Sequence, residues 1–313
     1  MTWSLGVQHE LFRNVSVNVG WFHRTFRDMF LCLRQPGANS SSCEFPNTSR
    51  TFADYVPVEV VNPINGEVFN VYNLTSAASL SKVDNLITNS STNKQVYNGF
   101  EVSLEARLPN GGTVLANTTT QRTLTNFCDV RDDPNLLRFC DRFHLPGPYR
   151  VPFRGDFKLA ANYPVPYGIM LSANFTSSPG RPEANFSPVD ELLPIDWNLT
   201  RTTRYTAADC VAPRPCTAGA PVVPGMVQTG LVVQLAPAGT TRFMERQNQI
   251  NLSVKKTLRI SRLEYAPEFD LFNVLNADTV VAERSSNYET PAYGLPSRVL
   301  IGRLMRLAVR VKW

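Results

Sequence analysis

The sequence lacks the long apolar segments that cross a membrane as helices. No run of about eighteen apolar residues occurs in its 313 residues, so we expect no transmembrane helix. The first residues, MTWSLGVQHE, have neither a charged start nor a long apolar core, which argues against a signal peptide at this point. We expect either a cytosolic chain or a numbering that begins inside a longer precursor.

Histidine and catalytic motifs are scarce as well. The three histidines are His9, His23 and His144, and no HExxH, GxSxG, Walker or dinucleotide-binding glycine pattern occurs. The acidic stretch DVRDDPN at 129–135 lacks the ligand spacing of a known calcium loop, and we interpret it as a solvated loop. The sequence therefore predicts no enzyme, no cofactor, no catalytic residue and no bound metal.

Runs of positive charge are also missing. The net charge is +5, but no Lys/Arg run reaches five residues, and the cations alternate with apolar residues. Nucleic-acid-binding proteins gather their cations in a patch or stripe. We therefore expect no nucleic acid partner.

The six cysteines form three local pairs, none with the CxxC spacing of metal or redox sites. The pairs are Cys32 with Cys43, Cys128 with Cys140, and Cys210 with Cys216. Six free thiols in the cytosol is the alternative interpretation. We favour three disulfides in an oxidising compartment, because each pair would close a short loop rich in turn-forming residues.

The last nine residues, MRLAVRVKW, alternate between apolar and polar side chains. Successive side chains of a strand point to opposite faces. A strand here would therefore have an apolar face and a cationic face. The apolar set is Met305, Leu307, Val309, Val311 and Trp313, and the cationic set is Arg306, Arg310 and Lys312.

The same alternation recurs along the chain and predicts about nine strands. They cover 2–11, 14–27, 95–108, 113–124, 150–163, 166–176, 246–258, 262–275 and 303–313. Globular strands usually have about five or six residues. Crossing a bilayer takes about 9–11 tilted residues, so these lengths indicate membrane-spanning strands.

The connections between the strands are alternately short and long. The long ones are 28–94, 125–149, 177–245 and 276–302, and all six cysteines lie in them. Short periplasmic turns and long extracellular loops are typical of transmembrane β-barrels. The predicted fold class is therefore an all-β, antiparallel, partial transmembrane barrel that spans residues 1–313.

Three other architectures are alternatives to this barrel. A soluble or surface β-sandwich used for adhesion or binding also alternates, but has shorter strands and loops. A propeller would show a repeat of about 40 to 50 residues, which does not occur. A small autonomous porin would require the chain to close as eight or ten strands.

Acidic residues of the strand 262–275 have the spacing to face the closing strand. Glu264, Glu268 and Asp270 lie at alternate positions, and we expect them on the lumen side, opposite Arg306, Arg310 and Lys312. The apolar residues of the closing strand are expected to face lipid, with Trp313 in an interfacial aromatic girdle.

Five stretches resemble the C-terminal part of TonB-dependent receptors, the plug-and-barrel transporters of the bacterial outer membrane. They are VYNGFEVSLEARLPNGG (96–112), YRVPFRGDFKLAANYPVPYGIMLSANFTSSPGRP (149–182), NQINLSVKKTLRI (248–260), EFDLFNVLNADTV (268–280) and LMRLAVRVKW (304–313). The FDLFNVLN segment is similar to the penultimate strand of large receptors with carboxypeptidase-regulatory-like N-terminal domains.

The resemblance implies a location in the bacterial cell outer membrane and a role in nutrient uptake. Loops 28–94 and 177–245 would capture an unknown nutrient, and Trp313 would be recognised by the barrel-assembly machinery. TonB would act only through a plug domain, which this sequence lacks. Family members have about 22 strands, so we expect a C-terminal fragment.

Overall fold

The computed structural model describes residues 1–30, 46–82, 84–180, 194–237 and 240–313. Strands dominate these residues, and the helices among them are short 3-10 turns: η1 (Phe52–Asp54), η2 (Ala77–Ser81), η3 (Pro134–Leu137) and η4 (Gly147–Tyr149). In this part of the chain no helix has the length and apolar character needed to cross a membrane. The predicted all-β class is confirmed.

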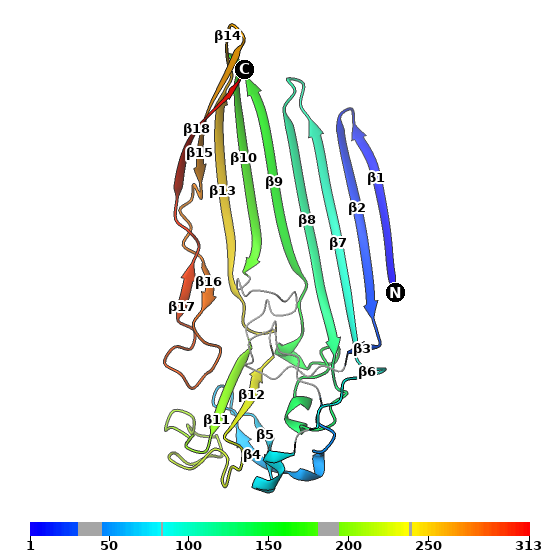
Figure 1. Cartoon of the computed structure of the whole chain (residues 1–313), viewed down its shortest axis with the longest axis vertical. Helices are drawn as coiled ribbons and strands as arrows, with labels where there is room; N and C mark the ends of the chain where they lie inside the picture. The colour runs from blue at the N-terminus through cyan, green and yellow to red at the C-terminus, as the bar shows by residue number, and fades with distance from the viewer. Residues whose placement is uncertain (31–45, 83, 181–193, 238–239) are drawn as a thin grey trace.

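Nine long strands and one short strand form a single antiparallel sheet (Figure 1). Its order is β1-β2-β7-β8-β9-β10-β13-β15, after which β15 pairs with both β18 and the short β14. The strands are β1 (Thr2–Phe12), β2 (Val15–Phe26), β7 (Lys94–Arg107), β8 (Thr113–Asn126), β9 (Arg154–Val165), β10 (Ile169–Gly180), β13 (Met244–Lys256), β14 (Leu258–Ile260), β15 (Leu263–Phe272) and β18 (Leu304–Lys312).

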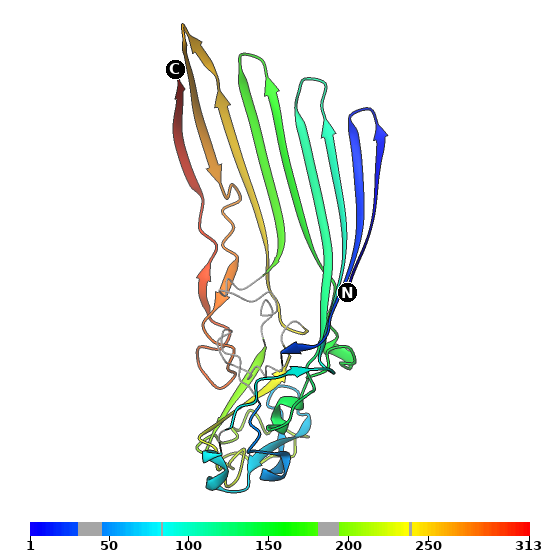
Figure 2. The ribbon, with the colours of Figure 1, turned by 45° about the vertical axis from the view of Figure 1, so that its right-hand side comes forward.

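The sheet is open, because β1 and β18 form its two edges and do not pair with each other in the described residues. Figure 2 shows the two edge strands on opposite sides of the sheet. Strand neighbours follow the chain order, since each strand pairs with the next long strand in the sequence. This up-and-down order is the one that alternating short and long connections predict.

The short connections lie together at one end of the sheet (Figure 1). Residues with positive φ make these reversals: Asn14 (68°), Gly111 (80°), Gly168 (70°) and Ser261 (56°). Asn and Gly tolerate this left-handed conformation better than most residues. The reversal after the strand predicted at 150–163 falls slightly later than the predicted strand end, because β9 continues through Val165.

The predicted strand limits differ from the observed ones by a few residues. The strand predicted at 150–163 begins at Arg154, after the 3-10 turn η4 and Pro152. The strand predicted at 262–275 ends at Phe272, because Asn273 adopts a φ of 50° and its side chain binds the backbone of Ala277. Alternation alone could not locate these ends.

The long connections are not simple loops. They contain four antiparallel pairs: β3 (Met29–Phe30) with β6 (Asn89–Ser90), β4 (Tyr55–Val61) with β5 (Val68–Leu74), β11 (Ile195–Thr200) with β12 (Gly230–Ala236), and β16 (Val280–Glu283) with β17 (Pro296–Val299). We call the described residues of 46–82, 127–149 and 194–237 the loop body. It lies at the end of the sheet opposite the short turns (Figures 1 and 2).

The main hydrophobic core lies in the loop body, not against the long sheet. Its members come from two long connections and include Val60, Val71, Trp197, Leu199 and Leu235, each about 1% exposed. The long sheet is a single layer, and in the described residues no second sheet packs on it. Its apolar side chains therefore remain exposed: Leu307 is 83% exposed and Trp313 95%.

Candidate functional site

The strand registers place most of the apolar side chains of the nine long strands on one face of the sheet. One row across neighbouring strands runs Val7, Val19, Val102, and another runs Ala161, Ala173, Leu252, Leu271, Met305. We call this surface the apolar face and the opposite one the polar face. A one-residue slip of any strand would mix the two.

The two faces differ in charge as well as in polarity. The positions of the nine strands that point to the apolar face hold no Asp or Glu. The polar face holds both signs, for example Glu101, Lys158 and Asp270. Acidic side chains are thus confined to one side of a single-layer sheet.

A hollow of about 460 Å³ lies on the polar face. Six consecutive strands contribute to it, through Gln8, Asn18, Ser103, Asn117, Lys158 and Asn174. Because one hollow is lined from six neighbouring strands, the sheet curves toward its polar face. The polar face is therefore concave and the apolar face convex, which is the reverse of a soluble barrel with an apolar interior.

The closing strand β18 follows the predicted division of faces. Met305, Leu307, Val309 and Val311 lie in register with Leu271, Phe269, Pro267 and Tyr265 on the apolar face. All four, together with Trp313, are exposed. Arg306, Arg310 and Lys312 lie in the rows of Asp270, Ala266 and Glu264 on the polar face.

The predicted lumen charges come together only in part. The Nε of Arg306 lies 2.7 Å from Asp270 Oδ2, and its Nη2 lies 3.3 Å from Glu268 Oε1. Glu264 is paired instead with Arg259 of β14, at 3.2 Å. Lys312 lies opposite Glu264 in the register, and Arg310 lies opposite Ala266.

Two of the three predicted cysteine pairs are disulfides. Cys128 is joined to Cys140 and Cys210 to Cys216, with Cα–Cα distances of 5.0 and 5.2 Å. Cys32 and Cys43 lie outside the described residues. Both bonds lie in the loop body, at the end of the sheet where the long connections meet.

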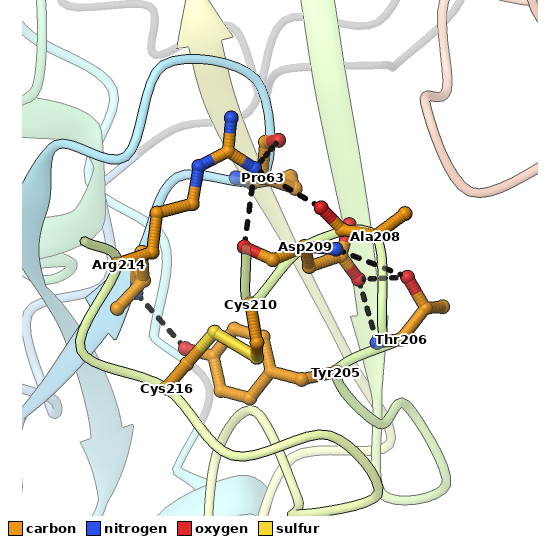
Figure 3. The surroundings of a disulfide bond; sticks show 9 residues. Pro63, Tyr205, Thr206, Ala208, Asp209, Cys210, Arg214 and Cys216 are labelled. Atoms are coloured by element: carbon orange, nitrogen blue, oxygen red, sulfur yellow. Dashed lines mark hydrogen bonds between the residues drawn. A yellow bond between two sulfur atoms is a disulfide. The ribbon is translucent and has the colours of Figure 1, made fainter. Parts of the chain in front are cut away.

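The loop closed by Cys210 and Cys216 is fastened to the β4–β5 hairpin (Figure 3). Its Arg214 donates from Nη1 to the carbonyl of Pro63 at 2.7 Å and from Nη2 to that of Ile64 at 3.0 Å. Nearby, the hydroxyl of Tyr205 accepts the backbone N–H of Val61 at 2.9 Å. The two long connections thus meet through hydrogen bonds as well as through the core.

A third connection joins the loop body through Arg138. Its guanidinium lies over the rings of Phe69 and Phe139, and its Nε donates to the carbonyl of Gln234 at 2.9 Å. Phe69, Arg138 and Gln234 come from three different long connections. The surface at this end of the molecule is therefore one packed unit.

The fourth connection is held by Asp196 of β11, which is fully buried. Its backbone pairs with 286–288, and its Oδ2 accepts the hydroxyl of Ser286 at 2.8 Å. Its Oδ1 has no hydrogen-bond partner among the described residues. Burial raises the pKa of Asp196 to about 6, although the Ser286 hydrogen bond opposes this shift.

No sequence pattern predicted a role for Arg138, Asp196, Tyr205 or Arg214. A signal for the loop core was present, because VPVEVV (56–61), VFNVYNL (68–74) and LVVQLA (231–236) are short apolar stretches within the long connections. No comparable signal marks the four polar residues. In the described residues no group of three or more His, Cys, Asp or Glu side chains is arranged to hold a metal ion.

Comparisons with known proteins give matches among solved structures only. No protein family matches the sequence, and no curated protein matches it. The chain is similar to the outer membrane transporter YddB from Escherichia coli, with 11% identity, a TM-score of 0.45 and coverage of 98% of this chain and 32% of that one.

It is also similar to the closed form of the ferric-catecholate import receptor Fiu from E. coli K12. That match has 12% identity, a TM-score of 0.37 and coverage of 99% of this chain and 34% of that one. The chain thus spans about a third of the length of both proteins. The first is described as an outer membrane transporter and the second as an import receptor.

Proposed function

We propose that the chain is part of the wall of an outer-membrane transport barrel and carries surface loops that capture a nutrient. One observation carries the proposal: nine strands in register have an exposed, acid-free apolar face on the convex side and a polar, charged face on the concave side. Lipid outside and water inside would satisfy both faces.

The energetic argument concerns the exposed apolar area. Water disfavours apolar surface by about 25 cal/mol for each Å², and large apolar patches are rare on soluble monomers. A soluble or surface β-sandwich would cover such a face with a second sheet, and none does so in the described residues. This favours the barrel wall over the adhesion module.

The loop body is the part of the proposal that concerns substrate capture. Its long connections are packed around their own core and cross-linked by two disulfides, and this rigidity suits a binding surface. We propose a transport role without catalysis. Coupling to TonB through a plug and recognition of Trp313 by the barrel-assembly machinery rest on the resemblance alone.

The closing strand supplies the test. Val309→Arg places a charge on the apolar face, where it would cost about 2–4 kcal/mol near the bilayer midplane. Arg310→Ala changes the neighbouring side chain on the polar face and is the matched control. We expect the first variant to be lost from outer-membrane fractions and the second to accumulate like the wild type. Equal accumulation of both would contradict the proposal.

A small autonomous porin remains the second candidate architecture. It would require β1 and β18 to close on each other, but they are the two edges of the sheet. Single-channel conductance and heat-modifiable gel mobility of the chain alone would indicate such closure.

A further inference from the structure

The apolar face carries cations where the strands meet the loop body. Lys94 begins β7, Arg122 lies near the end of β8, and Arg246 lies near the start of β13. The register aligns Arg122 with Asn98 and His23 in the apolar-face row, and Arg246 reaches the apolar-face Ser177. We call Lys94, Arg122 and Arg246 the rim cations.

Among the described residues, no ion pair joins a rim cation to a carboxylate. Arg122 lies over the ring of Phe153 at 4.4 Å, and Lys94 over that of Phe143 at 4.6 Å. Arg246 donates to the Ser177 hydroxyl at 2.8 Å and to the carbonyl of Gly155 at 2.6 Å. These contacts hold the side chains in place. The Asp141 carboxylate lies close enough to Lys94 for an electrostatic interaction, although the two groups form no ion pair.

The carboxylate nearest in charge to Lys94 has another side chain as its hydrogen-bond partner. Asp141, in the connection that contains Phe143, binds His144 at 2.8 Å. On the polar face, by contrast, Arg306 forms ion pairs with the carboxylates of Glu268 and Asp270. Among the described residues, the absence of direct ion pairs is therefore a property of the rim cations and not of the whole sheet.

The rim cations lie at the height where lipid headgroups would be expected. On the side of Arg122 that faces the short turns, the next apolar-face row contains Trp21 and Phe100. Aromatic rings gather at membrane interfaces. Farther toward the short turns, this face is aliphatic, as at Val19 and Val102. A cation just beyond the aromatic row would meet the charged layer of the membrane.

We propose that the rim cations bind the phosphates of anionic lipid headgroups in the leaflet next to the loop body. The inference rests on the proposed function, because it requires the apolar face to contact lipid. The planar guanidinium of Arg122 can bind two phosphate oxygens. Asn98 lies beside it, and its side-chain oxygen is 2.8 Å from His23 Nδ1, which leaves the amide N–H groups for the same phosphate.

Brominated lipids provide the measurement, since bromine on an acyl chain quenches tryptophan within contact distance. Trp3 lies in the row of Arg122 on the apolar face, and Trp21 lies in the neighbouring row. The full chain is reconstituted in equimolar phosphatidylcholine and phosphatidylglycerol, with bromine on one lipid or the other. We expect brominated phosphatidylglycerol to quench the tryptophans more strongly than brominated phosphatidylcholine. This preference for phosphatidylglycerol should fall about fivefold for each cation removed.

Three variants test the assignment: Lys94→Gln, Arg122→Gln and Arg246→Gln should each weaken the preference. Arg122→Lys keeps the charge and should retain most of it. Arg310→Gln removes a cation from the polar face and should leave the preference unchanged. An unchanged preference in all three neutral variants, or an equal loss in Arg310→Gln, would overturn the proposal.

Flotation with the vesicles separates this inference from the function on which it rests. A chain that floats but is quenched equally by both lipids keeps the barrel-wall proposal and overturns the lipid-phosphate site. A chain that does not float overturns both. Loss of the preference on adding inorganic phosphate, at constant ionic strength, would assign the site to free phosphate and overturn the lipid proposal.

Discussion

The guanidinium carbon of Arg138 lies 3.7 Å from the centre of the Phe69 ring. The same group lies 4.6 Å from the centre of the Phe139 ring, and its Nη2 is 2.9 Å from Glu67 Oε2. One half-buried cation therefore joins segments about seventy residues apart in the chain. If the loop body captures a nutrient, this contact helps to hold its surface in one shape.

Removing the Arg138 side chain should loosen the loop body. Cation–π contacts contribute about 0.5–2 kcal/mol each, and the Arg stem also packs against the rings. We expect Arg138→Ala to lower the free energy of unfolding by about 2 kcal/mol, measured by denaturant unfolding with the fluorescence of the core residue Trp197. Arg131→Ala, which removes an exposed pair with Asp129, is the control and should change it by less than about 1 kcal/mol.

Tyr205→Phe tests the hydrogen bond between two long connections. The change removes the acceptor of the Val61 N–H in the core and leaves that donor without a partner. An unsatisfied buried donor costs about 1–3 kcal/mol, so the loop body should be destabilised by this amount. Tyr149→Phe removes only an exposed contact with Asn65 and should have little effect. Equal unfolding midpoints for the two variants would contradict this role of Tyr205.

The buried Asp196 should make the loop body less stable as the pH rises from about 4 to about 6. Its folded-state pKa of about 6 exceeds the ordinary value of 3.8, so the folded state retains a proton that the unfolded state has released. The loss should total about 3 kcal/mol, because each pH unit corresponds to about 1.4 kcal/mol, and stability should be flat above this window.

Asp196→Asn isolates this contribution, since the amide cannot ionise. Hydrogen exchange of β11 and of residues 286–288, corrected for intrinsic rates, would follow the local opening as the pH changes. We expect protection in the wild type to fall across the window relative to the variant. Parallel profiles for both proteins would rule out Asp196 as the titrating group.

The two described disulfides should stabilise the loop body rather than the sheet. Closing loops of this length contributes about 2–3 kcal/mol through the unfolded chain. We expect the double variant Cys210→Ser, Cys216→Ser to be cleaved faster by protease within 194–237, while the sheet strands β1, β2 and β7 to β10 remain protected in detergent or lipid. Faster cleavage within the strands of the sheet would contradict a local effect.

Much of the long sheet could be predicted from alternation. In MRLAVRVKW, apolar and cationic side chains alternate with a period of two residues, which is a local property of the sequence. The register places Met305, Leu307 and Val309 on one face and Arg306 and Arg310 on the other. The turns near Asn14 and at Gly111 were also predictable, because the residue type determines which positions tolerate a positive φ. Strand ends such as Asn273 depend on side-chain hydrogen bonds that alternation does not contain.

The sequence by itself therefore determined the nine strands, their two faces, their turns and the two cysteine pairs Cys128–Cys140 and Cys210–Cys216. Only the tertiary structure decided that the long connections pack as one body and that the sheet is concave on its polar side. It also decided that Asp196 is buried and that the rim cations form no ion pair among the described residues. The physical reason is separation along the chain. Alternation acts between neighbours, whereas the core joins Val60 to Trp197 and Leu235 through contacts that no short pattern encodes.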